Sequence, residues 1–86
     1  MAKVTVRYWA AAKEAAGVAE ETFDAETLAA VLASALDRRG GDARLSAVFG
    51  RSSFLVDGSA VGSRAAGDVV LPDAAVIEVL PPFAGG

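Results

Sequence analysis

The C-terminal segment carries the residues best suited to chemistry. Two glycines, Gly85 and Gly86, follow an apolar run, Pro81-Pro82-Phe83-Ala84. A carboxylate carried by glycines has no Cβ beside its carbonyl, so it can enter a narrow channel and react there without steric obstruction. The candidate reactive site is therefore the carboxyl group of Gly86.

The same segment has the length and stiffness that insertion into a partner requires. Residues 81–86 reach at most about 20 Å when extended. Pro81 and Pro82 restrict φ and bias the base of the segment towards polyproline II, which lowers the entropy lost on insertion. We therefore predict a folded domain over residues 1–80 and a flexible tail over residues 81–86 that ends in Gly-Gly.

Composition narrows the classes of function. The 86 residues suffice for one small domain, with a net charge of -3. The basic residues are scattered except for Arg38-Arg39, so they form no continuous stripe for nucleic acid. The absence of cysteine and histidine removes disulfides, thiolate chemistry and the commonest metal ligand. We expect that this chain binds no cofactor and that any catalysis uses other groups or another protein.

The N-terminus and the hydropathy pattern bear on location. Residues 1–4 lead directly into an alternating pattern without the apolar core of a secretory signal. No stretch approaches about 18 unbroken large apolar residues. We therefore expect a cytoplasmic protein that does not enter a membrane.

Periodicity defines the elements of the first half. Alternation over residues 3–9 predicts a half-buried strand with Val4, Val6 and Tyr8 facing the core. The alanine-rich residues 10–16 predict a short helix that ends at Gly17, and residues 18–23 predict a second strand.

The main helix is predicted from residue 28 onwards. Apolar residues recur there at i, i+3, i+4, i+7 and i+8, namely Leu28, Val31, Leu32, Ala35 and Leu36. Its N-cap is either Asp24 or Thr27. We expect Arg38 and Arg39 to form a solvated helix end rather than an anion site.

The second half is predicted to be mostly extended. Residues 40–52 are expected to form a loop with a short apolar piece at 45–49. The turn Asp57-Gly58 between residues 53–56 and 59–61 predicts a hairpin. Residues 69–71 are expected to be extended, and residues 75–80 form the closing strand before Pro81.

This order of elements predicts the fold class. Strands before and after one amphipathic helix fit a mixed sheet that is packed on one face by that helix. We predict an α+β protein with the β-grasp (ubiquitin-like) arrangement. By analogy with that fold, the first and last strands are expected to be parallel neighbours in the middle of the sheet.

Alternation in the last strand also predicts a docking surface. If Ile77 and Val79 point into the core, their neighbours point to the other face of the sheet. That face would carry an apolar, partner-binding patch near the tail, made of Trp9, Val76, Leu80 and Phe83. Exposed apolar clusters of this kind commonly mark interfaces. For Trp9 and Phe83, an ordinary role as core or strand-end residues is an open alternative.

The whole chain resembles the MoaD/ThiS family of ubiquitin-like sulfur carriers. The ending Pro-Pro-x-Ala-Gly-Gly is the most specific part, and it is closer to the small subunit of molybdopterin synthase than to the thiamin-pathway carriers. The resemblance rests on residues 4–10, Lys13-Glu14, Gly17, residues 28–36, Val56-Asp57-Gly58 and residues 79–86.

This resemblance implies a non-catalytic carrier that acts as a protein cosubstrate. An E1-like enzyme would use ATP to convert the Gly86 carboxylate into an acyl-adenylate. A sulfur donor would then displace AMP and leave a C-terminal thiocarboxylate, with Pro81 to Gly85 serving as the inserted tail. The sulfur-accepting enzyme would be the large subunit of molybdopterin synthase, in molybdenum cofactor biosynthesis.

Three alternatives stay open. The carrier could serve cysteine, thiamin or thiosugar synthesis, and Phe83 leaves this question open because an aliphatic residue is commoner there in the molybdopterin group. A ubiquitin-like modifier would instead join Gly86 to a lysine of a target protein. A binding module that uses only the sheet face would not need Gly86.

Overall fold

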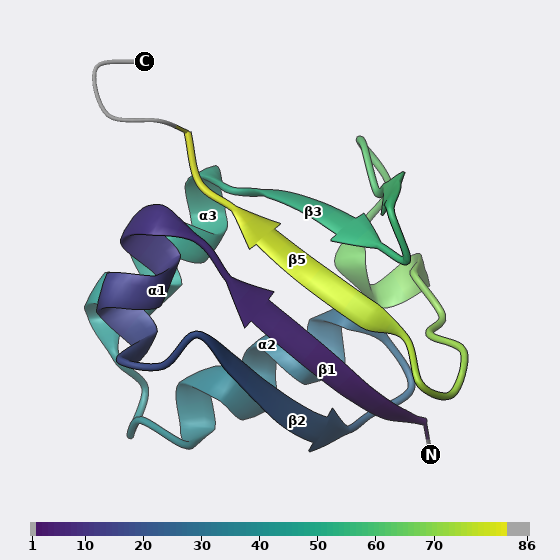
Figure 1. Ribbon diagram of the computed structural model, residues 1–86, viewed down its shortest axis with the longest axis horizontal. Coiled ribbons are helices and arrows are strands. Elements are labelled where there is room, and N and C mark those ends of the chain that lie inside the picture. Colours follow the sequence, from purple (N-terminus) through teal and green to yellow (C-terminus); the bar gives the residue numbers. More distant parts are fainter. Residues whose placement is uncertain (1, 83–86) are drawn as a thin grey trace.

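The computed structural model describes residues 2–82 and contains a five-stranded mixed sheet (Figure 1). The strand order is β2-β1-β5-β3-β4, with β1 and β5 parallel and the other pairs antiparallel. The strands are β1 (Lys3–Tyr8), β2 (Glu20–Asp24), β3 (Ser53–Val56), β4 (Ser59–Ala60) and β5 (Val76–Leu80). The predicted β-grasp arrangement and its central parallel pair are confirmed.

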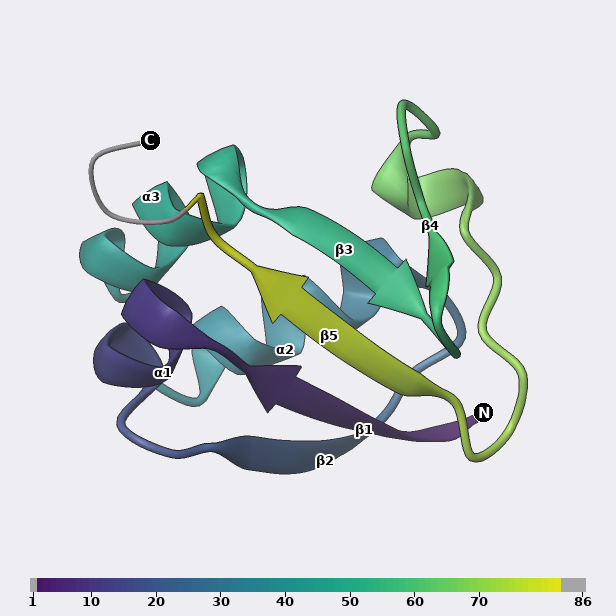
Figure 2. The same ribbon diagram turned by 45° about the horizontal axis from the view of Figure 1, so that its top comes forward.

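The sheet is amphipathic because its side chains alternate between two faces. Val4, Val6 and Tyr8 of β1 are buried, as are Ile77 and Val79 of β5. These residues face a core completed by the helices, and α2 (Leu28–Asp37) crosses behind the central strands in both views (Figures 1 and 2). In both views, none of the helices within residues 2–82 covers the opposite face of the sheet, which is called the open face (Figures 1 and 2).

Helix α2 forms where the apolar stripe predicts it. Leu28, Val31 and Ala35 are fully buried. Thr27 is the N-cap, because its Oγ1 accepts a hydrogen bond from the backbone N–H of Ala30 at 3.2 Å. The structure thus decides between the two predicted caps.

The short helix α1 (Ala10–Ala16) also forms as predicted. Gly17 ends it in the left-handed region at φ 81°, and its N–H donates to the carbonyl of Lys13 at 2.9 Å. This αL ending favours glycine, because a Cβ is strained at positive φ.

The prediction of a loop over residues 40–52 is wrong, because a third helix, α3 (Ala43–Arg51), forms there. Asp42 caps it through Oδ1, which accepts from the N–H groups of Arg44 (2.8 Å) and Leu45 (3.2 Å). Leu45, Val48 and Phe49 are buried at i, i+3 and i+4. The cap and the buried stripe together stabilise a helix in a segment rich in glycine and polar residues.

The hairpin between β3 and β4 turns at Asp57-Gly58, as predicted. Both residues have positive φ, 49° and 82°, as a type I′ turn requires. The Oδ1 of Asp57 also accepts the N–H of Val76 at 2.9 Å, which fixes the turn to the start of β5.

Residues 69–71 form no strand. A 3₁₀ turn, η1 (Ala66–Asp68), leads into them, and one antiparallel bridge joins Val70 to Thr27. Backbone hydrogen bonds from Leu28 to Val69 and from Leu71 to Glu26 flank this bridge. The extended conformation is therefore local, next to the start of α2.

Candidate functional site

The chain leaves the sheet at its centre. β5 is paired with β1 on one side and β3 on the other, up to the pair Ser53–Leu80. Pro81 is buried and Pro82 is exposed. The predicted reactive residue Gly86 and the predicted tail residues Phe83, Ala84 and Gly85 lie outside the described residues. The structure therefore defines the base from which the C-terminal segment starts.

The predicted sidedness of β5 is confirmed. Ile77 and Val79 have no exposed surface, whereas Val76, Glu78 and Leu80 are half-buried on the open face. Glu78 pairs in register with Arg7 of β1. Two apolar positions of the predicted patch, Val76 and Leu80, thus lie on this face, Leu80 next to the exit of the chain and Val76 at the opposite end of β5.

Trp9 is not a core residue, because 42% of its surface is exposed. It follows the last residue of β1, and its backbone N–H donates to the carbonyl of Val79 at 3.3 Å. Its indole Nε1 donates to Oε1 of Glu78 at 3.2 Å, and the guanidinium of Arg7 lies 5.2 Å from the ring centroid. These contacts hold the ring over the open face at the end where the chain leaves the sheet.

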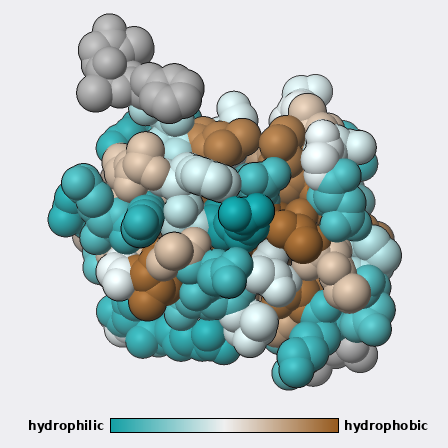
Figure 3. Space-filling model, in the orientation of Figure 1, coloured by the Kyte–Doolittle hydropathy of each residue, from teal (hydrophilic) through white to brown (hydrophobic). Residues whose placement is uncertain are grey.

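The apolar residues of this face do not form one continuous surface. Glu78 lies between Val76 and Leu80 along β5, and Figure 3 shows hydrophobic patches separated by hydrophilic side chains on this side of the molecule. Leu55 of β3, which pairs with Glu78, adds a half-buried apolar residue that the sequence analysis missed. Leu55 follows Phe54, which packs against the core, in the strand that leads into the Asp57-Gly58 turn. Because neighbouring residues of a strand face opposite ways, this order was the signal that could have identified Leu55.

A pocket of about 280 Å³ lies beside the exposed indole. Its charged groups are Arg7, Lys13 and Glu20. Because both signs of charge are present with an aromatic side chain, the pocket suits a polar side chain of a partner better than a free anion. The pocket lies between Trp9 of the predicted patch and Lys13 of α1.

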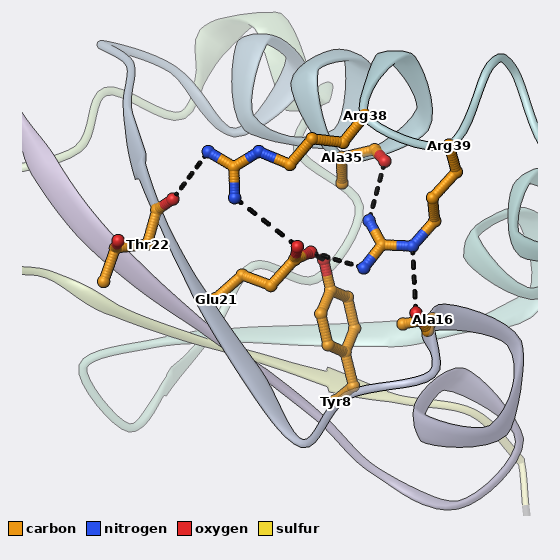
Figure 4. A network of polar contacts seen from close by, with 7 residues as sticks. All are labelled: Tyr8, Ala16, Glu21, Thr22, Ala35, Arg38 and Arg39. Carbon is orange, nitrogen blue, oxygen red and sulfur yellow. Dashed lines mark hydrogen bonds and ion pairs between the residues drawn. The ribbon is translucent and has the colours of Figure 1, made fainter.

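A second polar cluster lies away from the open face, where the end of α2 meets the sheet (Figure 4). Oε1 of Glu21 accepts from the hydroxyl of Tyr8 and from Nη2 of Arg39, both at 2.7 Å. Arg39 also donates to the carbonyls of Ala16 (3.0 Å) and Ala35 (2.8 Å). The prediction of a solvated helix end is wrong for Arg39, whose side chain is only 14% exposed and joins α1, α2 and β2.

Arg38 fits that prediction better, since half of its side chain is exposed. It nevertheless donates to the backbone carbonyl of Thr22 at 3.0 Å, and its Nη1 lies 3.4 Å from Oε2 of Glu21. Its guanidinium lies 4.1 Å from the ring centroid of Phe23. Arg38 therefore covers part of the free edge of β2.

The protonation states of this cluster are fixed by its surroundings. Burial raises the pKa of the Tyr8 phenol well above its ordinary value, and the hydrogen bond and charge of Glu21 raise it further. Desolvation by itself would raise the pKa of the Glu21 carboxyl, but hydrogen bonds from Tyr8 and Arg39 and the charge of Arg39 lower it overall. At neutral pH, Tyr8 is a neutral donor and Glu21 an anionic acceptor, so their hydrogen bond is matched and neither group is poised to exchange protons.

Two further properties concern residues 2–82. They hold no group of three or more side chains of the types that bind metal ions. None of their helices combines the length and the apolar character that crossing a membrane requires.

Comparison with known proteins relates this geometry to a family. The model of the ThiS family matches residues 6–86. A search of curated proteins found no match.

Solved structures share the fold over nearly the whole chain. Small archaeal modifier protein 1 from Methanosarcina acetivorans is 28% identical with a TM-score of 0.82, covering 100% of this chain and 98% of that one. A putative molybdopterin converting factor subunit 1 from Pyrococcus furiosus is 24% identical with a TM-score of 0.73, covering 96% and 100%. A complex of subunits 1 and 2 of molybdopterin-converting factor from Helicobacter pylori contains a chain that is 24% identical with a TM-score of 0.69, covering 98% and 99%. Because the family match extends over most of the sequence, from within β1 to the final glycine, the chain belongs to the ThiS family.

Proposed function

We propose that this chain is a sulfur carrier whose reactive group is the carboxyl group of Gly86. The observation that carries the proposal is the ThiS family match, which continues through the Gly85-Gly86 ending to residue 86. The central position of β5 supports it, because the segment that leads to Gly86 starts from a strand held on both sides.

Two chemical steps are required. A carboxylate resists nucleophiles because its charge is delocalised and its oxygen is a poor leaving group. In the first step, the Gly86 carboxylate attacks the α-phosphorus of ATP in an E1-like enzyme, and pyrophosphate leaves. In the second step, hydrosulfide supplied by the sulfur donor attacks the acyl carbon of the adenylate and AMP leaves, so that a thiocarboxylate remains.

The thiocarboxylate would then donate its sulfur in the active site of a second enzyme. Its sulfur is anionic at neutral pH and needs no base on the carrier, which agrees with the lack of histidine and cysteine in this chain. We propose that the accepting enzyme is the large subunit of molybdopterin synthase. The similarity to subunit 1 of molybdopterin-converting factor in Pyrococcus furiosus and in the Helicobacter pylori complex supports this choice.

We assign partner docking to the open face next to the exit of the chain. Trp9 and Leu80 supply apolar surface there, Val76 adds apolar surface at the far end of β5, and Arg7 and Glu78 supply charges between them. Phe83, which belongs to the proposed patch, lies outside the described residues. Aromatic residues that lie among charged neighbours in this way are common hot spots of interfaces.

The docking surface can be tested with Trp9→Asp. Aspartate suits this position structurally, because Trp9 is the N-cap of α1 and makes no side-chain capping bond. We expect the variant to keep the fold and to bind the large subunit at least about 10-fold more weakly in a calorimetric titration. Val18→Asp is the matched control, since Val18 is an apolar residue of similar exposure to Trp9 (40% against 42%) and lies outside this patch. Equal affinity of Trp9→Asp and the wild type would refute the assignment.

A second function, protein modification, is favoured by one observation. The structure of small archaeal modifier protein 1 from Methanosarcina acetivorans has a TM-score of 0.82 to this chain. The first activation step is shared, but in a modifier a lysine amine of the target attacks the acyl carbon of the adenylate, AMP leaves and an isopeptide forms.

Intact-mass analysis distinguishes the two functions. The chain is incubated with ATP, the activating enzyme and sulfide, with and without candidate target proteins. A carrier gains the mass difference between sulfur and oxygen at its C-terminal peptide, whereas a modifier appears as a protein–protein conjugate. A chain that lacks Gly86 should show neither product, and unchanged function of that variant would refute both proposals.

A further inference from the structure

An open groove lies at the end of the sheet where β1 begins and the chain enters β5. Its volume is about 490 Å³. The groove is lined by Ala2, Glu26, Thr27, Val70, Leu71 and Asp73. Since β5 runs from this end towards the exit of the chain, its five residues separate the groove from the proposed carrier site by about 15 Å.

Val70 presents unpaired backbone groups at this groove. The bridge between Thr27 and Val70 is flanked by hydrogen bonds from Leu28 to Val69 (3.0 Å) and from Leu71 to Glu26 (2.8 Å). In such a non-hydrogen-bonded antiparallel pair, the N–H and C=O of each paired residue point away from the partner strand. Within residues 2–82, neither backbone group of Val70 has a hydrogen-bond partner, and 75% of the residue is exposed.

The neighbouring residues limit how far a ladder could extend. In an extended chain, the next groups that point outward belong to residues 68 and 72. The N–H of Asp68 already donates to Ala65 at 2.9 Å, and Pro72 has no N–H. An added strand can therefore exchange both backbone hydrogen bonds, one through the N–H and one through the C=O, only with Val70.

The rim of the groove is acidic. Among the lining residues that the structure describes, Glu26 and Asp73 carry carboxylates and none carries a cation. Asp73 also accepts the backbone N–H of Lys3 at 2.9 Å. The free edge of β2, which a second copy of this chain would offer for pairing, contains Glu20 and Asp24, so like charges oppose self-association at this groove.

We propose that this groove binds an extended segment of a partner protein, in which an aliphatic residue pairs with Val70 and is flanked by lysine or arginine. The backbone pair sets the register, the aliphatic side chain packs on Val70, and the cations lie near Glu26 and Asp73. The inference goes beyond the sulfur-carrier proposal, because neither Gly86 nor the open-face patch takes part. A partner bound here leaves the exit of the chain free for a second protein.

The test uses the full-length chain and defined peptides. The probe is Ac-Arg-Val-Arg-Val-Arg-NH2, titrated into ¹⁵N-labelled protein while amide shifts are recorded by NMR. We expect saturable shifts at Glu26, Thr27, Val70 and Leu71, and slower hydrogen exchange at the amide of Val70. The peptide Ac-Glu-Val-Glu-Val-Glu-NH2 should bind at least about 5-fold more weakly, because its charges oppose those of the rim.

Two changes separate the backbone contribution to peptide binding from the charge contribution, and neither disturbs the fold. Methylation of the amide nitrogen of the central peptide residues removes the donor that would pair with the carbonyl of Val70, and it should abolish the slowed exchange. Glu26→Lys, an exposed substitution, should weaken the basic peptide by about 5-fold. Equal binding of the basic, acidic and N-methylated peptides, or shifts confined to the Trp9 end of the sheet, would overturn the proposal. Loss of Gly86 should leave peptide binding unchanged, so this test is independent of the carrier proposal.

Discussion

The largest stability effect outside the apolar core is expected at Arg39. Its guanidinium makes three short hydrogen bonds, to Glu21 (2.7 Å), Ala35 (2.8 Å) and Ala16 (3.0 Å), from a side chain that is 14% exposed. Arg39→Ala would remove all three and would leave Glu21 with the phenol of Tyr8 and the longer contact to Arg38. The variant therefore tests whether this cluster holds α1, α2 and β2 together.

The loss of stability expected for Arg39→Ala follows from the burial of its side chain and the number of its hydrogen bonds. Hydrogen bonds to charged groups contribute about 1.5 to 3 kcal/mol each, but they are not additive and water can replace part of them at this partly accessible site. Removal of one partner of a fully buried pair costs about 3 to 5 kcal/mol, and because this pair is partly accessible we expect a loss at the lower end, about 3 kcal/mol. For an 86-residue domain with a total stability of about 4 to 13 kcal/mol, this loss is large. It corresponds to a fall in melting temperature of about 12 to 24 °C.

The assay is urea unfolding at pH 7 followed by far-UV circular dichroism. Arg44→Ala is the control, because Arg44 forms an ion pair with Glu14 at 3.7 Å in which both side chains are at least two-thirds exposed. Its removal should change stability by less than about 1 kcal/mol. If Arg39→Ala costs no more than Arg44→Ala, the cluster does not stabilise the fold and the reasoning from burial is wrong.

Three further predictions concern the same cluster and two glycines. Because the folded-state pKa of Glu21 is lowered, the advantage of the wild type over Glu21→Gln should be full above the ordinary glutamate pKa and should vanish as the pH falls through the lowered value, as measured by urea melts from pH 7 to 2. Tyr8→Phe removes the 2.7 Å bond to Glu21 and should cost about 1 to 2 kcal/mol in the same assay. Gly58→Ala should lower the free energy of unfolding by about 1 kcal/mol, because φ is 82° in the hairpin turn. Gly50→Ala should not destabilise α3, since an added Cβ meets nothing within 4 Å and alanine favours a helix. Equal effects of the two substitutions would contradict this reasoning from φ.

Local pattern was sufficient to predict most of the fold. The alternation in β1 and β5, the stripe of α2 and the Asp57-Gly58 turn each appear in the structure where the sequence places them. These elements could be predicted because their signals come from neighbouring residues. The central parallel pairing of β1 and β5 came instead from analogy with a known fold.

The failed predictions have physical causes. Helix α3 was missed because Gly40, Gly41 and Gly50 indicate a loop, although Asp42 followed by a buried i, i+3, i+4 pattern was a helix signal. The role of Arg39 could not be predicted from local pattern, because its acceptors lie on α1, β2 and α2. Only the packing of these elements brings an arginine that follows a helix next to Glu21.

The structure also limits how deeply the proposed reactive group can enter a partner. Pro81 is buried and belongs to the folded body, so the segment beyond it comprises residues 82–86. Five residues span at most about 18 Å, whereas the six-residue tail predicted from the sequence would reach about 20 Å. Under the proposed function, an accepting active site lies within that distance of the surface proposed to contact Trp9 and Leu80. The open-face patch and the reach of Gly86 are then coupled, because a partner that docks farther from the exit of the chain would leave the carboxyl group short of its target.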